Sequence, residues 1–564
     1  MKFKDFKYER PDYEKVKDKF KTLVKQMEVS QSYEELKKNI DEINTLRNHV
    51  ESMSTLVSIR YSINTEDEFY IKEKEYWDEN GPHYEELNSL FYKALVNSDF
   101  KEKLTEELGK QFMSIADYSL QSFSKEIISE LQEENKLTSE YTKLLASAKI
   151  LFDGEERNLS GLGPYMTSSY RDEREKASKA YYNFFEENEN KFDELFDKLV
   201  KVRDKMAKKL GLENFVELGY IRMLRTDYNA KMVENFRQQV IDYIVPVANK
   251  LYKRQKERLG LQKLRYFDEN FEFNSGNAKP KGDSEFIMKT GILMYSELSK
   301  ETNEFFKYMM ENELMDLETK KGKGAGGYCT YIPDYKSPFI FSNFNSTADD
   351  IDVLTHEAGH AFQVYMSRWI EIPDINFPTY ESCEIHSMSM EFITWPWMEL
   401  FFKEQTDKYK FAHLSSGLLF LPYGVAVDEF QHAVYENPEM TPAERKATWK
   451  KIEEIYLPHL DYDGNSYYEA GGFWQRQAHI YASPFYYIDY TLAQICAFQF
   501  WKRSREDHEA AWKDYLYLCQ LGGSKSFTKL VAEANLISPF EDGCVESVIG
   551  SIEEYLNSVD DSAL

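Results

Sequence analysis

Two histidines and a glutamate at helical spacing form the pattern in this sequence that is best suited to chemistry. His356 and His360 are four positions apart, and Glu357 directly follows the first of them. On an α-helix, residues four apart lie on one face, so both imidazoles can reach a single cation about 2.0–2.1 Å away. Glu357 can then stand beside the open position of the cation and take a proton from a bound water. Apolar neighbours such as Leu354 and Phe362 predict that this helix is buried, where unpaired polar groups are costly.

A catalytic zinc site needs a third protein ligand, and a segment further along the chain offers several. Glu381, Glu384 and Glu391, together with Met388, recur at positions that share one helical face. Any one of these carboxylates could complete a site of two histidines and one glutamate. His386 lies off that face, so we expect it to support a ligand or to face the substrate. The remaining histidines lie outside any ligand spacing and are expected to be structural: His49, His83, His413, His432, His459 and His508.

An aromatic segment, residues 474–490, could supply the hydrogen-bond donors that a hydrolase needs. When water adds to an amide, negative charge develops on the carbonyl oxygen, and each donor to that oxygen typically contributes about 2.7–4 kcal/mol. His479, Tyr486 and Tyr490 are our candidates for these catalytic donors, and Tyr487 is a candidate for substrate contact. The alternative is that these aromatic side chains are core residues, which is common in a chain with 40 tyrosines.

A glycine-rich turn precedes two segments that predict short strands. Gly326 and Gly327 end the turn, and β-branched and aromatic runs follow at residues 329–332 and 339–341. The turn lacks the terminal Gly-Lys-Ser/Thr of a phosphate-binding loop. A strand edge beside glycines would let an extended peptide form main-chain hydrogen bonds, which makes both glycines candidate substrate contacts. A flexible turn between a helix and a strand is the alternative.

The elements that must position these residues are predicted to be mainly helices. Aromatic residues make up 15% of the 564 residues, and 25 Gly with 16 Pro leave few turn signals. Val16, Phe20 and Met27 recur at helical spacing between charged residues, which predicts an amphipathic helix. Similar segments continue to about residue 260, with short breaks such as residues 79–82.

Residues 274–283 gather turn-forming side chains and predict a loop. We place an approximate boundary there between an N-terminal helical lobe, residues 1–275, and a catalytic lobe, residues 276–564, although parts of the two lobes can interleave. One further helical stretch is predicted over residues 284–312.

The composition disfavours several classes of protein and of partner. Lys plus Arg number 70 and Asp plus Glu 97, so the net charge of 70 − 97 = −27 disfavours nucleic acid as a partner. Five scattered cysteines argue against a disulfide scaffold and favour a reducing compartment. The first residues lack the apolar core of a secretory signal, and the longest apolar stretch falls short of the ~20 residues that span a bilayer. We therefore expect a cytoplasmic protein without a membrane partner.

The two candidate metal segments together resemble a known family. His356-Glu-Ala-Gly-His360, followed by Glu384-Ile-His-Ser-Met-Ser-Met-Glu391, is similar to the thimet oligopeptidase family of zinc metallopeptidases, and specifically to its bacterial, Pz-peptidase-like oligoendopeptidase F branch. The likeness spans about residues 150–500, including residues 152–160 and 218–227. It implies that Glu384 is the third ligand of one Zn²⁺ per chain and that Glu391 supports a ligand.

The same resemblance implies a fold and a substrate class. The fold would be mainly α and two-lobed, with a small β-sheet next to the H-E-x-x-H helix and a deep central channel that admits oligopeptides and excludes folded proteins. The relatives also place a histidine and tyrosines across from the metal, in a register that departs somewhat from residues 479–490.

These observations predict a zinc-dependent endopeptidase that hydrolyses short peptides by metal-activated water, with Glu357 as the general base. A zinc carboxypeptidase of similar helical fold is one alternative, because such enzymes share the H-E-x-x-H pattern and a downstream glutamate. A non-catalytic peptide-binding protein is the alternative from another class. An intact Glu357 argues against it, since a binder has no use for a base beside the water position.

Overall fold

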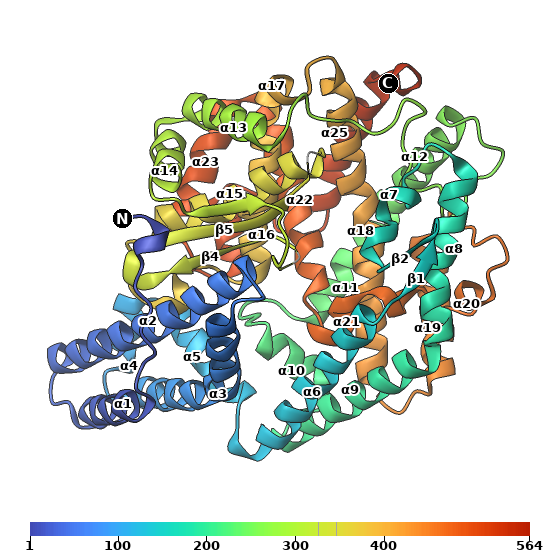
Figure 1. The fold of residues 1–564 in the computed structure, drawn as a ribbon. Coiled ribbons are helices and arrows are strands. Elements are labelled where there is room, and N and C mark those ends of the chain that lie inside the picture. The colour runs from blue at the N-terminus through green and yellow to red at the C-terminus, as the bar shows by residue number, and fades with distance from the viewer. Residues whose placement is uncertain (325, 346) are drawn as a thin grey trace.

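The protein is mainly helical, as Figure 1 shows, and its described residues also form two small sheets. The computed structural model describes residues 1–324, 326–345 and 347–564, and only the backbone of residue 82. Ala325, inside the glycine-rich turn, therefore lies outside the described residues. The expected mainly α architecture with a small sheet beside the H-E-x-x-H helix is confirmed, whereas the deep channel and the lobe boundary near residue 275 stay predictions.

The N-terminal helices pack through apolar stripes that the sequence makes visible. In α1 the buried residues are Val16, Phe20, Leu23, Val24 and Met27, which is the predicted stripe. The side chain of Asp12 caps this helix by accepting from the amide of Lys15. The helices of this group are α1 (Tyr13–Val29), α2 (Tyr33–Ile63), α3 (Glu68–Val96), α4 (Lys101–Leu108) and α5 (Lys110–Ser122).

The predicted break at residues 79–82 is wrong, because α3 runs through it without interruption. Trp77 precedes the supposed break and Tyr84 and Leu87 follow it, and all three are buried. Packing of this continuous apolar face outweighs the low helix propensity of glycine and proline.

A second group of helices leads toward the middle of the chain. It also contains a hairpin that the sequence analysis missed, although its Asp153-Gly154 turn, with φ of 50° and 78°, is a hairpin signal. The elements are α6 (Ile128–Ala146), β1 (Ile150–Phe152), β2 (Glu155–Arg157), α7 (Gly163–Met166), α8 (Arg171–Glu187), α9 (Glu189–Lys209), α10 (Phe215–Arg222), α11 (Ala230–Gln239) and α12 (Val245–Arg258).

The predicted loop at residues 274–283 is confirmed, but the helical stretch after it is divided. Ser299 separates α13 (Ser284–Leu298) from α14 (Lys300–Glu311) in an extended conformation. Its hydroxyl caps α14 by accepting from the amide of Thr302, and the Thr302 hydroxyl accepts from the amide of Ser299. This reciprocal pair satisfies free helix-end groups and starts a new helix in place of one long one.

Both predicted strands are present in a sheet with the order β3-β5-β4. The strand β5 (Ser337–Phe344) lies in the centre, parallel to β3 (Met315–Glu318) and antiparallel to β4 (Tyr328–Ile332). Among the described residues, β4 pairs with β5 alone, so its other side has no strand partner.

The remaining helices build the centre of the molecule, where α16 packs between α15 and α22, and α15 also packs on β4 and β5. Figure 1 shows α1–α5 gathered beside β4, and α7–α9 with the β1–β2 hairpin on the opposite side. The central and C-terminal helices are α15 (Asp349–Ser367), α16 (Tyr380–Ile393), α17 (Met398–Phe402), α18 (Thr406–Glu436), α19 (Pro442–Tyr456), α20 (Ser466–Glu469), α21 (Ala478–Ala482), α22 (Tyr487–Glu506), α23 (His508–Leu521), α24 (Phe527–Glu533) and α25 (Cys544–Ser558).

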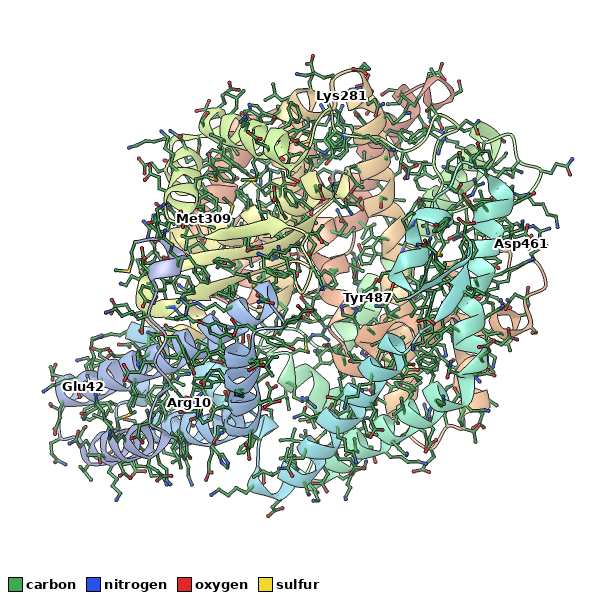
Figure 2. All side chains as sticks on the ribbon, in the orientation of Figure 1. Arg10, Glu42, Lys281, Met309, Asp461 and Tyr487 are labelled. Atoms are coloured by element: carbon green, nitrogen blue, oxygen red, sulfur yellow. The ribbon has the colours of Figure 1, made fainter. Side chains whose placement is uncertain are left out.

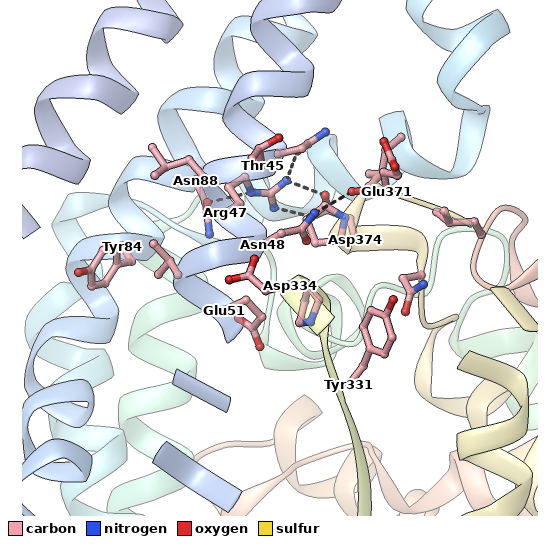
Figure 3. Close-up of a pocket in the computed structure, with 18 of the residues that line it drawn as sticks. Thr45, Arg47, Asn48, Glu51, Tyr84, Asn88, Tyr331, Asp334, Glu371 and Asp374 are labelled. Carbon is pink, nitrogen blue, oxygen red and sulfur yellow. Dashed lines mark hydrogen bonds and ion pairs between the residues drawn. The ribbon is translucent and has the colours of Figure 1, made fainter. Parts of the chain in front are cut away.

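A buried ion pair ties the N-terminal helices to the chain that enters α16. It lies on the wall of a cavity of about 730 Å³ between α2, α3, the end of β4 and residues 368–377 (Figure 3). The Arg47 guanidinium donates two hydrogen bonds of 2.8 Å to the Asp374 carboxylate, and the hydroxyl of Tyr92 donates to the same group. A planar fork of this kind fixes orientation as well as distance.

Among the described residues, no helix has the length and apolar character to cross a membrane. The expectations of a cytoplasmic location and of no nucleic-acid partner stay predictions.

Candidate metal centre and active site

Three potential metal ligands converge between α15 and α16. Glu384 Oε2 lies 3.3 Å from Nε2 of His356 and 3.5 Å from Nε2 of His360. Two ligands at about 2.1 Å from an ion and at tetrahedral angles are themselves about 3.4 Å apart. The donor set of two imidazoles and one carboxylate thus fits a divalent cation in spacing and in chemistry. The histidine side chains retain 24% and 14% exposure, so solvent can reach the site.

A glycine makes this convergence possible. A Cβ built on Gly359 of α15 would lie 2.6 Å from the carbonyl oxygen of His386 and 2.7 Å from Cα of Ser387. Any side chain at this position would therefore push α16 away. Because Gly359 lies between the two histidines and the α16 contact lies next to Glu384, the close approach of the helices brings the carboxylate to the imidazoles.

Hydrogen bonds orient two of the ligands. The hydroxyl of Ser387 donates to Glu384 Oε2 at 2.9 Å. The Nδ1 of His356 lies 2.7 Å from Glu391 Oε1, and Nε2 of His413 lies 2.8 Å from the other oxygen of that carboxylate. Because Glu391 is an acceptor, His356 carries its proton on Nδ1 and turns the lone pair of Nε2 toward the ligand cluster.

His413 corrects an expectation, because the sequence analysis treated it as structural only. It comes from α18, and its Nδ1 accepts a hydrogen bond of 3.0 Å from the indole N–H of Trp395. An indole only donates, so this contact places the proton of a neutral His413 on Nε2, facing Glu391. No sequence signal could have found this residue, since 22 positions separate it from Glu391.

The charges around the cluster favour a cation in its centre. Burial opposes ionisation of Glu384, but His360 and His356 outweigh it and hold the pKa of this carboxyl below its ordinary value. Burial likewise opposes protonation of His356, but Glu384 and Glu391 raise its pKa. The carboxylates thus attract positive charge to this point, and a proton and a metal ion would compete for it.

Glu357 stands beside the cluster with an unused oxygen. Its side chain is buried, and its Oε2 has no hydrogen-bond partner among the described residues. Burial raises the pKa of Glu357 above its ordinary value. A carboxylate that is poorly solvated and not tied up by neighbours is a stronger base than an exposed one.

The glycine-rich turn lies next to this base. A Cβ built on Gly327 would lie 3.7 Å from Glu357 Oε1, so the absence of a side chain leaves space in front of the carboxylate. Gly326 has a φ of 89°, which favours glycine. Its carbonyl accepts a 2.9 Å hydrogen bond from Asn343, which uses one of the two lone pairs of that oxygen.

The aromatic segment reaches the cluster from α21 and α22. The hydroxyl of Tyr486 donates to Glu384 Oε1 at 3.1 Å. The rings of Tyr486 and Tyr490 stand 5.0 Å apart, and the His479 ring lies 5.9 Å from the first and 6.0 Å from the second. Burial and Glu384 raise the pKa of Tyr490 to about 12 and that of Tyr486 further, so both phenols stay protonated donors.

Tyr487 lies beside Tyr490, with ring centroids 5.8 Å apart, but its other ring contacts are with α18 and His479. Its ring packs 5.6 Å from that of Phe420 and 5.9 Å from that of Tyr423, both on α18, and 4.9 Å from His479. Figure 2 shows Tyr487 near the middle of the view, whereas Lys281 lies at the rim. The side chain is thus near the site without reaching the ligand cluster.

His386 does not face the site, contrary to expectation. It is fully buried, and its Nδ1 donates to the carbonyl of Ser382 at 2.7 Å. Burial lowers its pKa to about 4, so the ring is neutral. Its ring lies 6.3 Å from that of Tyr515 on α23, on the side of α16 that points away from Glu384.

Comparison with known proteins agrees with this architecture. The fold and the two-histidine, one-carboxylate cluster are those of a helical metallopeptidase. The chain belongs to peptidase family M3: the model of that family matches residues 165–548, and the model of the Peptidase M3 N-terminal domain matches residues 3–123. The protein is accordingly a metalloendopeptidase, and the resemblance to oligoendopeptidase F is confirmed.

Individual relatives support the assignment. An oligoendopeptidase F homolog of Borreliella burgdorferi is 24% identical over 432 residues, which cover 71% of this chain and 70% of that protein. The oligopeptidase PepF of Bacillus subtilis is 22% identical over 500 residues, which cover 81% of this chain and 71% of that one. The solved structure of PZ peptidase A with inhibitor 2 is 61% identical, covers 100% of both chains and has a TM-score of 0.94.

Proposed function

We propose that this metalloendopeptidase depends on zinc, held by His356, His360 and Glu384, and hydrolyses short peptides with Glu357 as the general base. The observation that carries the proposal is the 3.3 and 3.5 Å spacing of the three donor atoms, beside a buried carboxylate with a free oxygen. When bound, Zn²⁺ supplies a Lewis acid that polarises water and the scissile carbonyl.

Glu357 handles the proton in this mechanism. Its Oε2 has no partner among the described residues, so it is available to accept a proton from the attacking water. The same carboxyl then delivers that proton to the nitrogen of the leaving amine. Burial raises the pKa of Glu357 above its ordinary value, which makes this carboxylate a stronger base in the first step than an exposed glutamate would be.

Neutral hydrogen-bond donors across from Glu357 stabilise the oxyanion, which is the negative oxygen that forms from the scissile carbonyl when water adds to it. The amide Nε2 of Gln477 lies 2.7 Å from Nδ1 of His479, and the hydroxyl of Tyr423 donates to the amide oxygen at 2.9 Å. With Nδ1 as an acceptor, His479 presents its Nε2–H as a donor. Tyr490 donates its hydroxyl, and Tyr486 exchanges Glu384 for the substrate oxygen.

An extended peptide would lie along the unpaired side of β4, beside Gly326 and Gly327. Such main-chain contacts do not depend on side chains and suit an enzyme with broad tolerance. Tyr487 contributes apolar surface near the bound peptide.

Cleavage of a peptide blocked at both ends tests the proposal. Purified enzyme should contain one zinc per chain by elemental analysis, and mass spectrometry should find internal cleavage products. A carboxypeptidase would leave the blocked peptide intact. The variant Glu357→Gln should keep the metal and lose turnover by at least about 10²-fold. Full turnover in this variant would refute the role of the base.

A further inference from the structure

The residue before Tyr486 has a strained backbone. Phe485 has a φ of 67°, a left-handed conformation that is unfavourable for an L-residue. Such a conformation persists only where the surroundings hold it. The amide of Phe485 donates to Gln431 Oε1 at 2.8 Å, and its ring is fully buried.

The ring of Phe485 occupies space that a glycine leaves free. A Cβ built on Gly219 of α10 would lie 2.5 Å from this ring. The ring of Tyr220 packs against it as well, with centroids 5.7 Å apart. The side chain of Phe485 is therefore fixed against α10.

Arg225 holds the backbone of the same segment on both sides of Tyr486. Its Nη2 donates to the carbonyl oxygen of Phe485 and, at 3.0 Å, to Oδ1 of Asp489. Asp489 lies in the first turn of α22, and its amide donates to the carbonyl of Tyr486 at 2.9 Å. One guanidinium thus links the residue before Tyr486 to the residue three positions after it. Both charged side chains of this pair are fully buried.

Arg225 is itself fixed in place. Its guanidinium lies over the ring of Tyr220, 4.3 Å from the centroid. The next residue, Thr226, donates its hydroxyl to Gln111 of α5 at 2.8 Å. The preceding residue, Leu224, turns the chain out of α10 with a φ of 54°. The donor therefore has little freedom to follow a displaced acceptor.

We propose that Arg225 is a positioning residue for Tyr486: it fixes the start of α22 so that the hydroxyl of Tyr486 is held at the metal cluster. The inference rests on the catalytic role proposed above for Tyr486. The metal ligands belong to α15 and α16, and Arg225 contacts none of them by hydrogen bond. We call the two hydrogen bonds from Arg225, to the Phe485 carbonyl and the Asp489 carboxylate, the clamp. Loss of the clamp should therefore lower kcat without removing the metal.

The variant Arg225→Lys separates the clamp from the charge. Both hydrogen bonds of Arg225 come from Nη2, which the planar guanidinium holds in place over the ring of Tyr220. A lysine keeps one positive charge, but its ammonium sits on a flexible stem and lacks this planar group, so it cannot hold a donor in the same orientation. A misplacement of about 1 Å can cost about 10²-fold in rate. We therefore expect kcat to fall by about 10–100-fold, with a change in KM below about 3-fold and with unchanged zinc content.

A double-mutant cycle with Tyr486→Phe provides the test, with kcat measured on the blocked peptide. If Arg225 acts through Tyr486, adding Arg225→Lys to Tyr486→Phe should lower kcat by less than about 2-fold, because the phenol hydroxyl that the clamp positions is already gone. Independent, multiplying losses would overturn the inference. Arg445→Lys is the matched control, because Arg445 is equally buried and donates at 2.9 Å to the carboxylate of Asp197 and at 3.4 Å to the carbonyl of Pro438, neither of which belongs to α22. Its kcat should stay within about 2-fold of wild type.

The outcomes separate this inference from the proposed function. If Tyr486→Phe leaves kcat unchanged while Glu357→Gln abolishes turnover, the role of Tyr486 and this inference both fail, but the zinc mechanism stands. If Arg225→Lys does not fold by circular dichroism, Asp489→Asn replaces it in the cycle. This variant keeps the side-chain shape and weakens one arm of the clamp. An unchanged kcat in Asp489→Asn would then refute the inference.

Discussion

Replacement of Gly359 by alanine should separate the two helices that hold the metal ligands. The new Cβ would lie 2.6 Å from the carbonyl oxygen of His386, whereas ordinary contacts begin at 3.4 Å. Because the opposing atoms are backbone, relief requires α15 and α16 to move apart by 3.4 − 2.6 = 0.8 Å. The carboxylate of Glu384 would move with α16.

Two energies oppose each other in this variant. Alanine is favoured over glycine inside a helix by about 0.5–1 kcal/mol, but overpacking of a close contact costs about 1–3 kcal/mol. We therefore expect Gly359→Ala to lower the free energy of unfolding by about 1–2 kcal/mol. Ligand distances tolerate changes of only about 0.2 Å, so the displacement should weaken zinc binding at least tenfold, or by about 1.4 kcal/mol.

Chelator competition would measure the zinc affinity, and denaturant unfolding of the metal-free protein would measure stability. Gly550→Ala in α25 is the matched control, because a Cβ there meets nothing within 4 Å. In this control the free energy of unfolding should rise by about 0.5–1 kcal/mol, and the zinc affinity should stay that of wild type. If Gly359→Ala also gained stability and bound zinc normally, the close approach at Gly359 would not be what positions Glu384.

Three further variants test other parts of the structure. Arg47→Met should cost about 3–5 kcal/mol in unfolding free energy, because it leaves the buried carboxylate of Asp374 without its cation. His413→Phe removes one donor to Glu391 and should weaken zinc binding by about 10–100-fold in chelator competition. Burial and the nearby Asp489 raise the pKa of Glu381 from 4.5 to about 8. Its neutral form therefore contributes stability that is fully present below pH 4.5 and lost as pH rises to about 8, so the unfolding free energy of Glu381→Gln should fall less than that of wild type between pH 5 and pH 8.

Each of these variants has an outcome that would contradict its reasoning. A broken buried ion pair typically costs about 3–5 kcal/mol. If Arg47→Met instead lowered the unfolding free energy by less than about 1 kcal/mol, water would be compensating the charge of Asp374. For His413, the variant His413→Gln retains an amide donor and should recover part of the affinity. Equal losses of zinc affinity in both variants would show that the packing of the His413 side chain matters, and not its hydrogen bond to Glu391. For Glu381, parallel stability curves of variant and wild type from pH 5 to 8 would show that the carboxyl does not titrate in this range.

Much of the site could be predicted from sequence because it depends on local geometry. The spacing of His356 and His360 places both imidazoles on one face of any α-helix, whatever surrounds it. The apolar stripe of α1 and the β-branched runs of β4 and β5 are local patterns of the same kind, and the structure bears them out. The hairpin signal at Asp153-Gly154 was equally local and could have been used.

Residue spacing alone could not distinguish the three glutamates of α16, because helical periodicity presents them on one face; the family resemblance pointed to Glu384, and the tertiary structure gives the physical reason. Glu384 lies at the turn where Gly359 brings α15 close, and it reaches both histidines. Glu391 lies two turns further on and reaches only the far nitrogen of His356. Glu381 is buried beside Asp489 instead. Which glutamate reaches the histidines depends on where α15 and α16 cross, and the sequence of neither helix alone determines that crossing point.

The sequence of this protein thus determined its mainly helical character, the strands β4 and β5 and the two-histidine pattern, because each follows from residues close together in the chain. Spacing left open which carboxylate joins the histidines, and only the tertiary structure shows why it is Glu384. Tertiary structure alone decided that His413 supports the histidines through Glu391 and that Arg225 reaches across to the segment of Tyr486. These contacts join residues 22 to 264 positions apart, and their distances are set by the packing of whole helices.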